Sequence, residues 1–252
     1  MLEIKNLTKV FYPGTSEENI LFDNLNIVFK TGESTAIIGP NGCGKSTLLN
    51  IISGSLVQDS GEIKLDDILI STMAEEDRAN FIGKVCQDPS MGVAGNLTIL
   101  ENMALAYKKG EKFTLGSLLK NTDEEKILIK LASIGLGLEK KLSTKVKYLS
   151  GGQRQSLSLL MTTVKHPKVL LLDEHTAALD PKTSVLVMDK TKELIEKEKM
   201  TTLMISHNFY EAIGYCDNII MLNKGKLAFN LRSEDISFAD LNTLYNKEIL
   251  NS

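Results

Sequence analysis

Residues 39–47 form a glycine-rich segment whose composition and spacing suit the binding of nucleotide phosphates. They read Gly-Pro-Asn-Gly-Cys-Gly-Lys-Ser-Thr, which fits G-x-x-x-x-G-K-S/T between an aliphatic run and an apolar helical pattern. The glycines let successive backbone N–H groups point at phosphate oxygens, Lys45 reaches the β- and γ-phosphates, and the Ser46 hydroxyl binds Mg²⁺. We therefore predict a phosphate site formed by Gly39, Asn41, Gly42, Cys43, Gly44, Lys45, Ser46 and Thr47.

Two adjacent acids, Asp173 and Glu174, follow an aliphatic run at residues 169–172. Both carboxylates should therefore emerge at the carboxyl end of a buried strand, where open α/β sheets bind their ligands. Because neighbouring residues of an extended chain point in opposite directions, one carboxylate can bind the metal while the other faces the attacking water. We predict that Asp173 contributes to the Mg²⁺ site and that Glu174 is the general base.

A second glycine-containing segment, residues 149–153, reads Leu-Ser-Gly-Gly-Gln and precedes another helical pattern. Ser150 is a suitable N-cap, and Gly151 and Gly152 leave backbone N–H groups accessible at the start of the helix. Together with Gln153 they predict a second phosphate cradle in the same chain.

The elements around these motifs indicate an α/β fold. Alternating apolar and polar residues at 2–7 and 25–29 predict half-buried strands of an antiparallel flank. Short apolar runs at 35–39, 169–173 and 202–206 are separated by helical patterns, which is typical of buried parallel strands with crossover helices. The phosphate segment and the two acids thus fall at strand ends.

Residues 90–165 differ in composition from the rest of the chain, with Leu, Lys and Glu in long helical patterns and a Thr98-x-x-Glu101 capping box. We predict one domain over 1–252, in which this helical lobe is inserted into an α/β core made of 1–89 and 166–252. The end of the chain, residues 237–250, has apolar side chains near helical spacing and predicts a terminal helix on the core.

Composition excludes several classes of protein. The 252 residues carry a net charge of −3 with a pI of about 5.7, so no general basic field exists to hold a nucleic acid. The three cysteines form no C-x-x-C pair, which favours a reducing compartment and predicts a cytoplasmic location. We find no signal peptide and no apolar run long enough to span a membrane.

The string at 149–153 resembles the signature of the ATP-binding cassette (ABC) proteins, and the resemblance covers essentially the whole chain. It implies roles for further residues. Gln87 resembles the glutamine that touches Mg²⁺ and the attacking water, in a loop that meets the membrane partner. His207 resembles the histidine that contacts the γ-phosphate. We therefore expect Glu174, His207 and Gln87 at the catalytic site, and Ser46, Gln87 and Asp173 around the metal.

Two further positions complete the nucleotide site that the resemblance implies. Residues 178–180 resemble the D-loop of the family, which assigns Asp180 to the site. Phe11 resembles the aromatic residue that stacks on adenine, with Tyr12 as the alternative. One departure follows the catalytic acid: most cassettes have Pro where this chain has His175, which either tunes the site electrostatically or is a tolerated loop residue.

The resemblance implies an ABC ATPase fold and the hydrolysis of MgATP for a separate transmembrane permease at the inner face of the membrane. The pattern after Glu174 resembles a bacterial subgroup that works with a lipoprotein-type binding protein, in systems sometimes assigned to aromatic amino acids. A head-to-tail homodimer is expected, because the signature of this fold cannot reach the P-loop of its own chain. An importer subunit is favoured. An exporter ATPase and a cassette outside transport are the alternatives.

Overall fold

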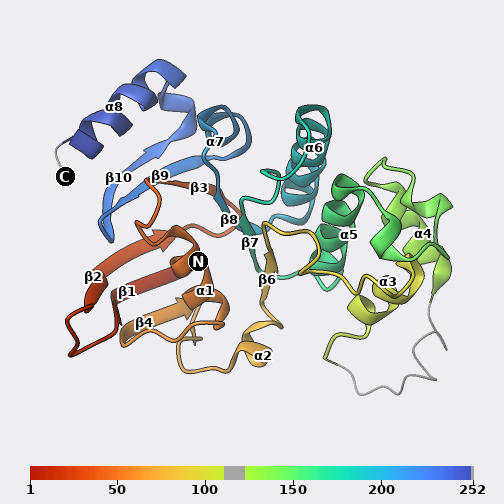
Figure 1. Ribbon diagram of the computed structural model, residues 1–252, viewed down its shortest axis with the longest axis horizontal. Helices are drawn as coiled ribbons and strands as arrows, with labels where there is room; N and C mark the ends of the chain where they lie inside the picture. The colour runs from red at the N-terminus through yellow and green to blue at the C-terminus, as the bar shows by residue number, and fades with distance from the viewer. Residues whose placement is uncertain (111–122, 251–252) are drawn as a thin grey trace.

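The computed structural model describes residues 1–110 and 123–250, and a six-stranded sheet crosses its centre (Figure 1). Pairing is parallel throughout this sheet except between its last two strands in sequence, which form an antiparallel hairpin. The strands in spatial order are β10 (Lys226–Arg232), β9 (Asn218–Asn223), β3 (Ser34–Ile38), β8 (Thr201–Ile205), β7 (Val169–Asp173) and β6 (Ile82–Val85).

The predicted antiparallel flank is a separate four-stranded sheet. Its order is β2 (Asn19–Phe29), β1 (Leu2–Phe11), β4 (Ser60–Leu65) and β5 (Ile68–Leu69). The alternation at the start of the chain is reproduced in the structure, where Leu2 and Ile4 are fully buried and Lys5 is exposed. This sheet packs its apolar face toward α1 (Lys45–Ser53) and the central sheet.

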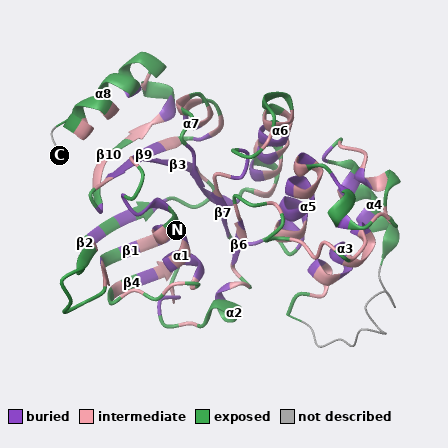
Figure 2. Ribbon diagram, viewed as in Figure 1, coloured by how far each residue is buried: buried purple, intermediate pink, exposed green. Residues whose placement is uncertain are grey.

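Strand β7 is buried on both faces, because its side chains alternate between two apolar cores. Val169 and Leu171 join the core shared with the antiparallel sheet, whereas Leu170 and Leu172 join a core on the helical side. Such two-sided burial explains why this strand is an unbroken aliphatic run. Figure 2 shows the buried residues concentrated in the strands and on the inner faces of the helices.

The predicted helical segment contains α3 (Ile99–Tyr107), α4 (Glu124–Ala132) and α5 (Gly151–Thr163), which lie together on one side of the molecule (Figure 1). Thr98 and Glu101 form the expected capping box at the start of α3. Two 3₁₀ turns, η2 (Leu138–Lys140) and η3 (Val146–Tyr148), precede α5. The proposed division of the chain at residues 90 and 165 stays a prediction.

The remaining helices complete the α/β core. They are α2 (Glu75–Arg78), α6 (Pro181–Glu198), α7 (Phe209–Tyr215) and α8 (Phe238–Leu250), with a 3₁₀ turn η4 (Ser233–Asp235) before the last. The terminal helix α8 lies on the core as predicted: Leu241 is fully buried, and the rings of Tyr245 and Phe209 are 5.1 Å apart. In the part of the chain that the structure describes, no helix has both the length and the apolarity needed to span a membrane.

Candidate active site

The glycine-rich segment joins β3 to α1, as the sequence predicted. Two of its glycines have close neighbours on the side where a Cβ would lie. A Cβ added to Gly39 would be 2.2 Å from the carbonyl oxygen of Leu222, and one added to Gly44 would be 2.7 Å from the ring of Phe22. Both glycines also have positive φ, 149° and 105°, so a side chain at either position would displace the loop.

Lys45 is the first residue of α1 and is buried under the loop that precedes it. Its Nζ donates to the carbonyl oxygens of Gly39, at 2.8 Å, and Pro40, at 3.0 Å. The loop thereby holds an ammonium group at the N-terminus of a helix, and the two positive features together suit a phosphate. Around them, Asn41 and Gly42 are exposed, Cys43 is buried and Thr47 is intermediate.

The other end of α1 is fixed by Arg78, a residue that the sequence analysis did not select. Arg78 is only 2% exposed. Its Nη1 donates to the carbonyl oxygens of Ile51 and Ile52 in the last turn of α1, at 2.7 and 3.3 Å, and its Nη2 donates to Ser71 at 2.9 Å. A cation that satisfies the final carbonyls of a helix stabilises that helix. Arg78 therefore positions the helix that carries the phosphate loop.

Ser46 and Asp173 meet although 127 positions separate them. The Ser46 hydroxyl donates to Oδ1 of Asp173 at 3.1 Å, from the start of α1 to the end of β7. Burial raises the pKa of Asp173, while the hydrogen bond from Ser46 and the charge of Lys84 on β6 oppose that rise. Lys84 was not selected from the sequence either. A partly desolvated carboxylate next to a hydroxyl is a suitable oxygen donor pair for a hard cation such as Mg²⁺.

No group of three or more His, Cys, Asp and Glu side chains that could hold a metal occurs in the described residues. Mg²⁺ usually needs no such cage, because it binds one or two carboxylates together with substrate phosphates and water. The pair Ser46 and Asp173 beside the phosphate loop therefore fits Mg²⁺ delivered with a nucleotide.

Glu174 lies at the centre of a contact between three segments. Its Oε2 accepts from Nε2 of Gln87 at 3.3 Å, and its Oε1 lies 2.9 Å from Nε2 of His207. The Glu174 backbone has φ of 45°, in the left-handed region that a glutamate adopts only at a cost. Such strain is typical of functional sites, and here it places the carboxylate between the ends of β6 and β8.

His175 is buried beside this carboxylate rather than lying in an exposed loop. It is 2% exposed, and its Nε2 lies 3.4 Å from the hydroxyl of Thr191 on α6. Burial lowers the pKa of His175 to about 4, so the ring is neutral at physiological pH. Both alternatives for His175, electrostatic tuning of the site and a tolerated loop residue, stay predictions.

The second glycine segment begins α5, and Ser150 is its N-cap as predicted. Ser150 and Gln153 form a reciprocal capping box, and Nε2 of Gln153 also donates to the carbonyl oxygen of Leu136 at 3.2 Å. A Cβ added to Gly152 would lie 2.2 Å from Cγ2 of Thr183, in the first turn of α6. The hydrogen bonds of Ser150 and Gln153 are thus made within the helical side of the molecule, apart from the phosphate loop.

Asp180 is the N-cap of α6 and accepts from the backbone N–H of Thr183 at 3.1 Å. Hydrogen bonds from the Thr183 hydroxyl and from the Thr183 backbone N–H lower the pKa of Asp180. Because Gly152 packs on the same Thr183, the signature segment and the D-loop segment are neighbours in the folded chain. The predicted role of Asp180 in nucleotide binding stays a prediction.

The two candidate adenine-stacking residues end β1. Phe11 is partly buried, with Nζ of Lys9 lying 5.5 Å from its ring centroid. Tyr12 has φ of 53° and is 65% exposed. The structure thus offers both rings near one strand end, and Phe11 stays the predicted one.

The predicted residues therefore fall into two groups. One group gathers at the carboxyl edge of the central sheet: Lys45, Ser46, Gln87, Asp173, Glu174 and His207. The other, residues 150–153, belongs to α5. The arrangement in the first group can bind a phosphate chain with its cation and orient a water for attack on phosphorus.

Comparisons with known proteins agree with this chemistry. A family model described as ABC transporter matches residues 22–177, more than half of the chain. The tyrosine transport ATP-binding protein of Clostridioides difficile is 48% identical, with 93% of both chains covered. The phosphonates import ATP-binding protein of Lactiplantibacillus plantarum is 32% identical, covering 97% of this chain and 94% of that one.

Solved structures agree as well. A dimeric ATP-binding cassette in a post-hydrolysis state with bound ADP and Pi is 30% identical, with a TM-score of 0.77, covering 92% of this chain and 99% of that one. The cassette cbiO1 of Clostridium perfringens, part of the ABC transporter complex cbiONQ, is 27% identical with a TM-score of 0.78, covering 96% of this chain and 92% of that one. The chain therefore belongs to the ABC transporter family and is one of its ATP-binding and ATP-hydrolysing domains.

Proposed function

We propose that this chain is the MgATP-hydrolysing subunit of a bacterial importer of small solutes, with aromatic amino acids as the favoured class. The observation that carries the solute class is the 48% identity to a tyrosine transport ATP-binding protein over nearly the full length of both chains. Other relatives with about one third identity are named as import proteins for phosphonates and petrobactin, which supports import and leaves the solute open.

Within each site, Glu174 is the general base that takes a proton from the attacking water. Its contacts to Gln87 and His207 support this role, because both neighbours can also hydrogen-bond to a water or a phosphate oxygen. Lys45 binds the β- and γ-phosphates from the loop, and Ser46 and Asp173 hold Mg²⁺. When bound, the cation neutralises charge that develops on the phosphates.

A complete site needs a second copy of the chain. Ser150, Gly151, Gly152 and Gln153 form a phosphate cradle at the N-terminus of α5, yet their hydrogen bonds are made within the helical side of their own chain. We assign these residues to the ATP site of the partner subunit in a head-to-tail homodimer. The solved relative with bound ADP and Pi is a dimer, which supports this assembly.

The membrane partner is a separately encoded permease, to which this subunit binds at the inner face of the membrane. The permease and a binding protein select the solute, so the ATPase chain carries no solute specificity of its own. Met91, in the loop after Gln87, is 73% exposed and supplies an apolar contact for a permease segment.

Transport by the assembled complex tests this proposal. The subunit would be purified with its permease, reconstituted in proteoliposomes with ATP on the side of this subunit, and tested for movement of labelled L-tyrosine. Import predicts movement toward the ATP side that requires the binding protein. Movement away from ATP without a binding protein would identify an exporter and contradict the proposal.

A further inference from the structure

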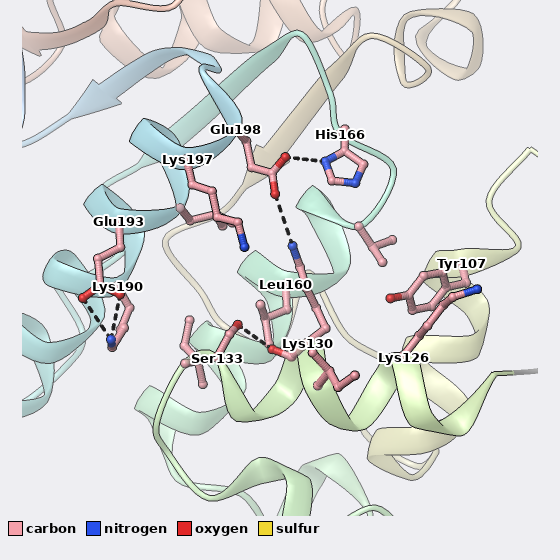
Figure 3. A pocket seen from close by; sticks show the side chains of 14 residues that line it. Tyr107, Lys126, Lys130, Ser133, Leu160, His166, Lys190, Glu193, Lys197 and Glu198 are labelled. Atoms are coloured by element: carbon pink, nitrogen blue, oxygen red, sulfur yellow. Dashed lines mark hydrogen bonds and ion pairs between the residues drawn. The ribbon is translucent and has the colours of Figure 1, made fainter.

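A cavity of about 470 Å³ lies away from the nucleotide site, at the junction between the helical side of the molecule and the core. Its walls come from α4, the last turns of α5 and the second half of α6 (Figure 3). This volume is in the range of small-molecule sites. The nucleotide residues, by contrast, lie at the carboxyl ends of the strands and around the N-terminus of α1.

One side of the cavity is apolar. Leu160 and Val164 of α5 and Ile134 after α4 are buried and form its floor. The ring of Tyr107, at the end of α3, lies at one end of the cavity (Figure 3). A flat hydrocarbon group would gain free energy by leaving water for this floor.

The rest of the cavity lining is basic, although the chain as a whole carries a net charge of −3. Four lysines line it against two glutamates, so the lining has a positive surplus: the cations are Lys126, Lys130, Lys190 and Lys197, and the anions are Glu193 and Glu198.

The carboxylates leave part of this charge without compensation. Lys126 is paired with Asp123 at 2.9 Å, Lys190 is paired with Glu193 at 2.7 Å, and Glu198 lies 2.7 Å from Nδ1 of His166. Lys130 lies 4.0 Å from Glu198, at the outer limit of an ion pair, while its side chain is only 18% exposed. No ion pair joins Lys197 to a carboxylate among the described residues.

Lys130 and Lys197 also repel each other, because they reach from α4 and α6 toward the same opening (Figure 3). Burial lowers the pKa of Lys130; the charge of Glu198 opposes this shift, and the charge of Lys197 adds to it. An anion between the two ammonium groups would replace this repulsion by two charge-assisted hydrogen bonds.

We propose that this cavity binds a small aromatic carboxylate, with its ring on the floor formed by Leu160 and Val164 and its carboxylate between Lys130 and Lys197. The ligand joins α4 of the helical side to α6 of the core. A ligand that binds only the folded chain raises the melting temperature of the chain, and the effect grows with the logarithm of ligand concentration once that concentration exceeds the dissociation constant. Binding does not depend on ATP hydrolysis, so this proposal and the proposed function can fail separately.

The test uses three small molecules with the full-length subunit, without nucleotide, in saturation-transfer NMR and thermal melting. The probe is 3-(4-hydroxyphenyl)propionate. Tyramine has the same ring with an ammonium group in place of the carboxylate, and propionate has the carboxylate alone. We expect binding and a higher melting temperature for the probe only. Saturating ADP should leave the binding unchanged, because the phosphate loop is a different anion site.

Two variants locate the ligand and one variant is the control. Lys130→Gln and Lys197→Gln should each weaken binding of the probe about tenfold or more, the usual effect of losing one hydrogen bond to a charged group. Lys141→Gln removes an exposed lysine outside the cavity and should bind as the wild type does. Equal binding of tyramine, displacement of the probe by ADP, or unchanged affinity in both variants would overturn the proposal.

Discussion

The imidazole Nε2 of His207 lies 2.9 Å from Oε1 of Glu174, and this contact is a consequence of strand order. Strands β7 and β8 are parallel neighbours in which Asp173 pairs with Ile205. Glu174, directly after β7, and His207, two residues after β8, therefore emerge at the same edge, and the backbone N–H of Glu174 donates to the carbonyl of Ile205 at 3.2 Å. The sheet thus brings a carboxylate and an imidazole together from positions 33 residues apart.

The head-to-tail assembly predicts that two inactive variants restore activity when mixed. Lys45→Ala removes the phosphate-binding ammonium, and Ser150→Arg blocks the signature cradle, so each variant alone should be inactive. In a mixed dimer, the intact loop of the Ser150→Arg chain faces the intact signature of the Lys45→Ala chain. A steady-state ATPase assay at equal concentrations should recover activity up to about one quarter of the wild type, from one intact site in half of the dimers.

A signature that served the loop of its own chain would give a different result. Each variant chain would then have either a defective phosphate loop or a defective signature in its own site. Mixing the two variants would not restore ATPase activity. Absence of recovery, with dimers shown to exchange subunits, would therefore contradict the assembly.

An added charge should have different effects at two positions of the loop after Gln87, because the two side chains differ in exposure. Met91 is 73% exposed, whereas Val93 is partly buried against the helical core. Met91→Glu should leave the melting temperature and the basal ATPase activity of the subunit near normal, and should prevent co-purification with the permease. Val93→Asp should lower the melting temperature by several degrees, because an unpaired carboxylate loses its hydration when it is buried against apolar side chains.

Comparing the two variants distinguishes a role of Met91 in binding the permease from a role in the stability of the subunit. A Met91→Glu subunit that still co-purifies with the permease would show that the docking surface lies elsewhere. An equally large loss of stability in both variants would show that Met91 also belongs to the core.

The burial of His175 predicts how the free energy of unfolding depends on pH. The pKa of His175 is about 4 in the folded chain, against an ordinary value of 6.5. Below pH 6.5, His175 is protonated in the unfolded chain. In the folded chain it stays neutral until the pH falls to about 4. The free energy of unfolding should therefore fall as the pH drops from 6.5 to 4, by on the order of 3 kcal/mol in total. Above pH 6.5, His175 should not make the free energy of unfolding depend on pH.

Chemical denaturation of the nucleotide-free subunit across this range measures the effect. His175→Phe cannot titrate, so its free energy of unfolding should depend less steeply on pH between 6.5 and 4 than that of the wild type. Parallel curves for the two proteins would contradict the burial of a neutral imidazole at this position.

Residues within contiguous motifs could be predicted from the sequence, because a motif carries its own local geometry. The phosphate loop needs Gly39 and Gly44 where side chains would collide, and Ser150 caps α5 through a residue three positions away. The helix starts at Thr98 and Ser150 are local in the same sense. The fold class followed from strand ends that coincide with these motifs.

Contacts between distant segments could not be predicted in the same way. The role of Arg78 at the end of α1 has no local signal, since the two α1 carbonyl groups that it binds lie more than 20 residues earlier. The burial of His175 depends on α6 packing over it. The β9–β10 hairpin was also missed, although Lys224 and Gly225 both have positive φ, as a two-residue turn requires. A glycine preceded by Lys is a weaker turn signal than Asn-Gly.

The central claim is that Glu174 activates the attacking water, and the Glu174→Gln variant tests it most directly. Glutamine keeps the shape and can hydrogen-bond to Gln87 and His207, but it cannot accept a proton from water. We expect MgATP binding to remain near normal while single-turnover hydrolysis falls by about two to four orders of magnitude. The ATP-loaded dimer should then accumulate in size-exclusion chromatography. Hydrolysis near the wild-type rate in this variant would contradict the account.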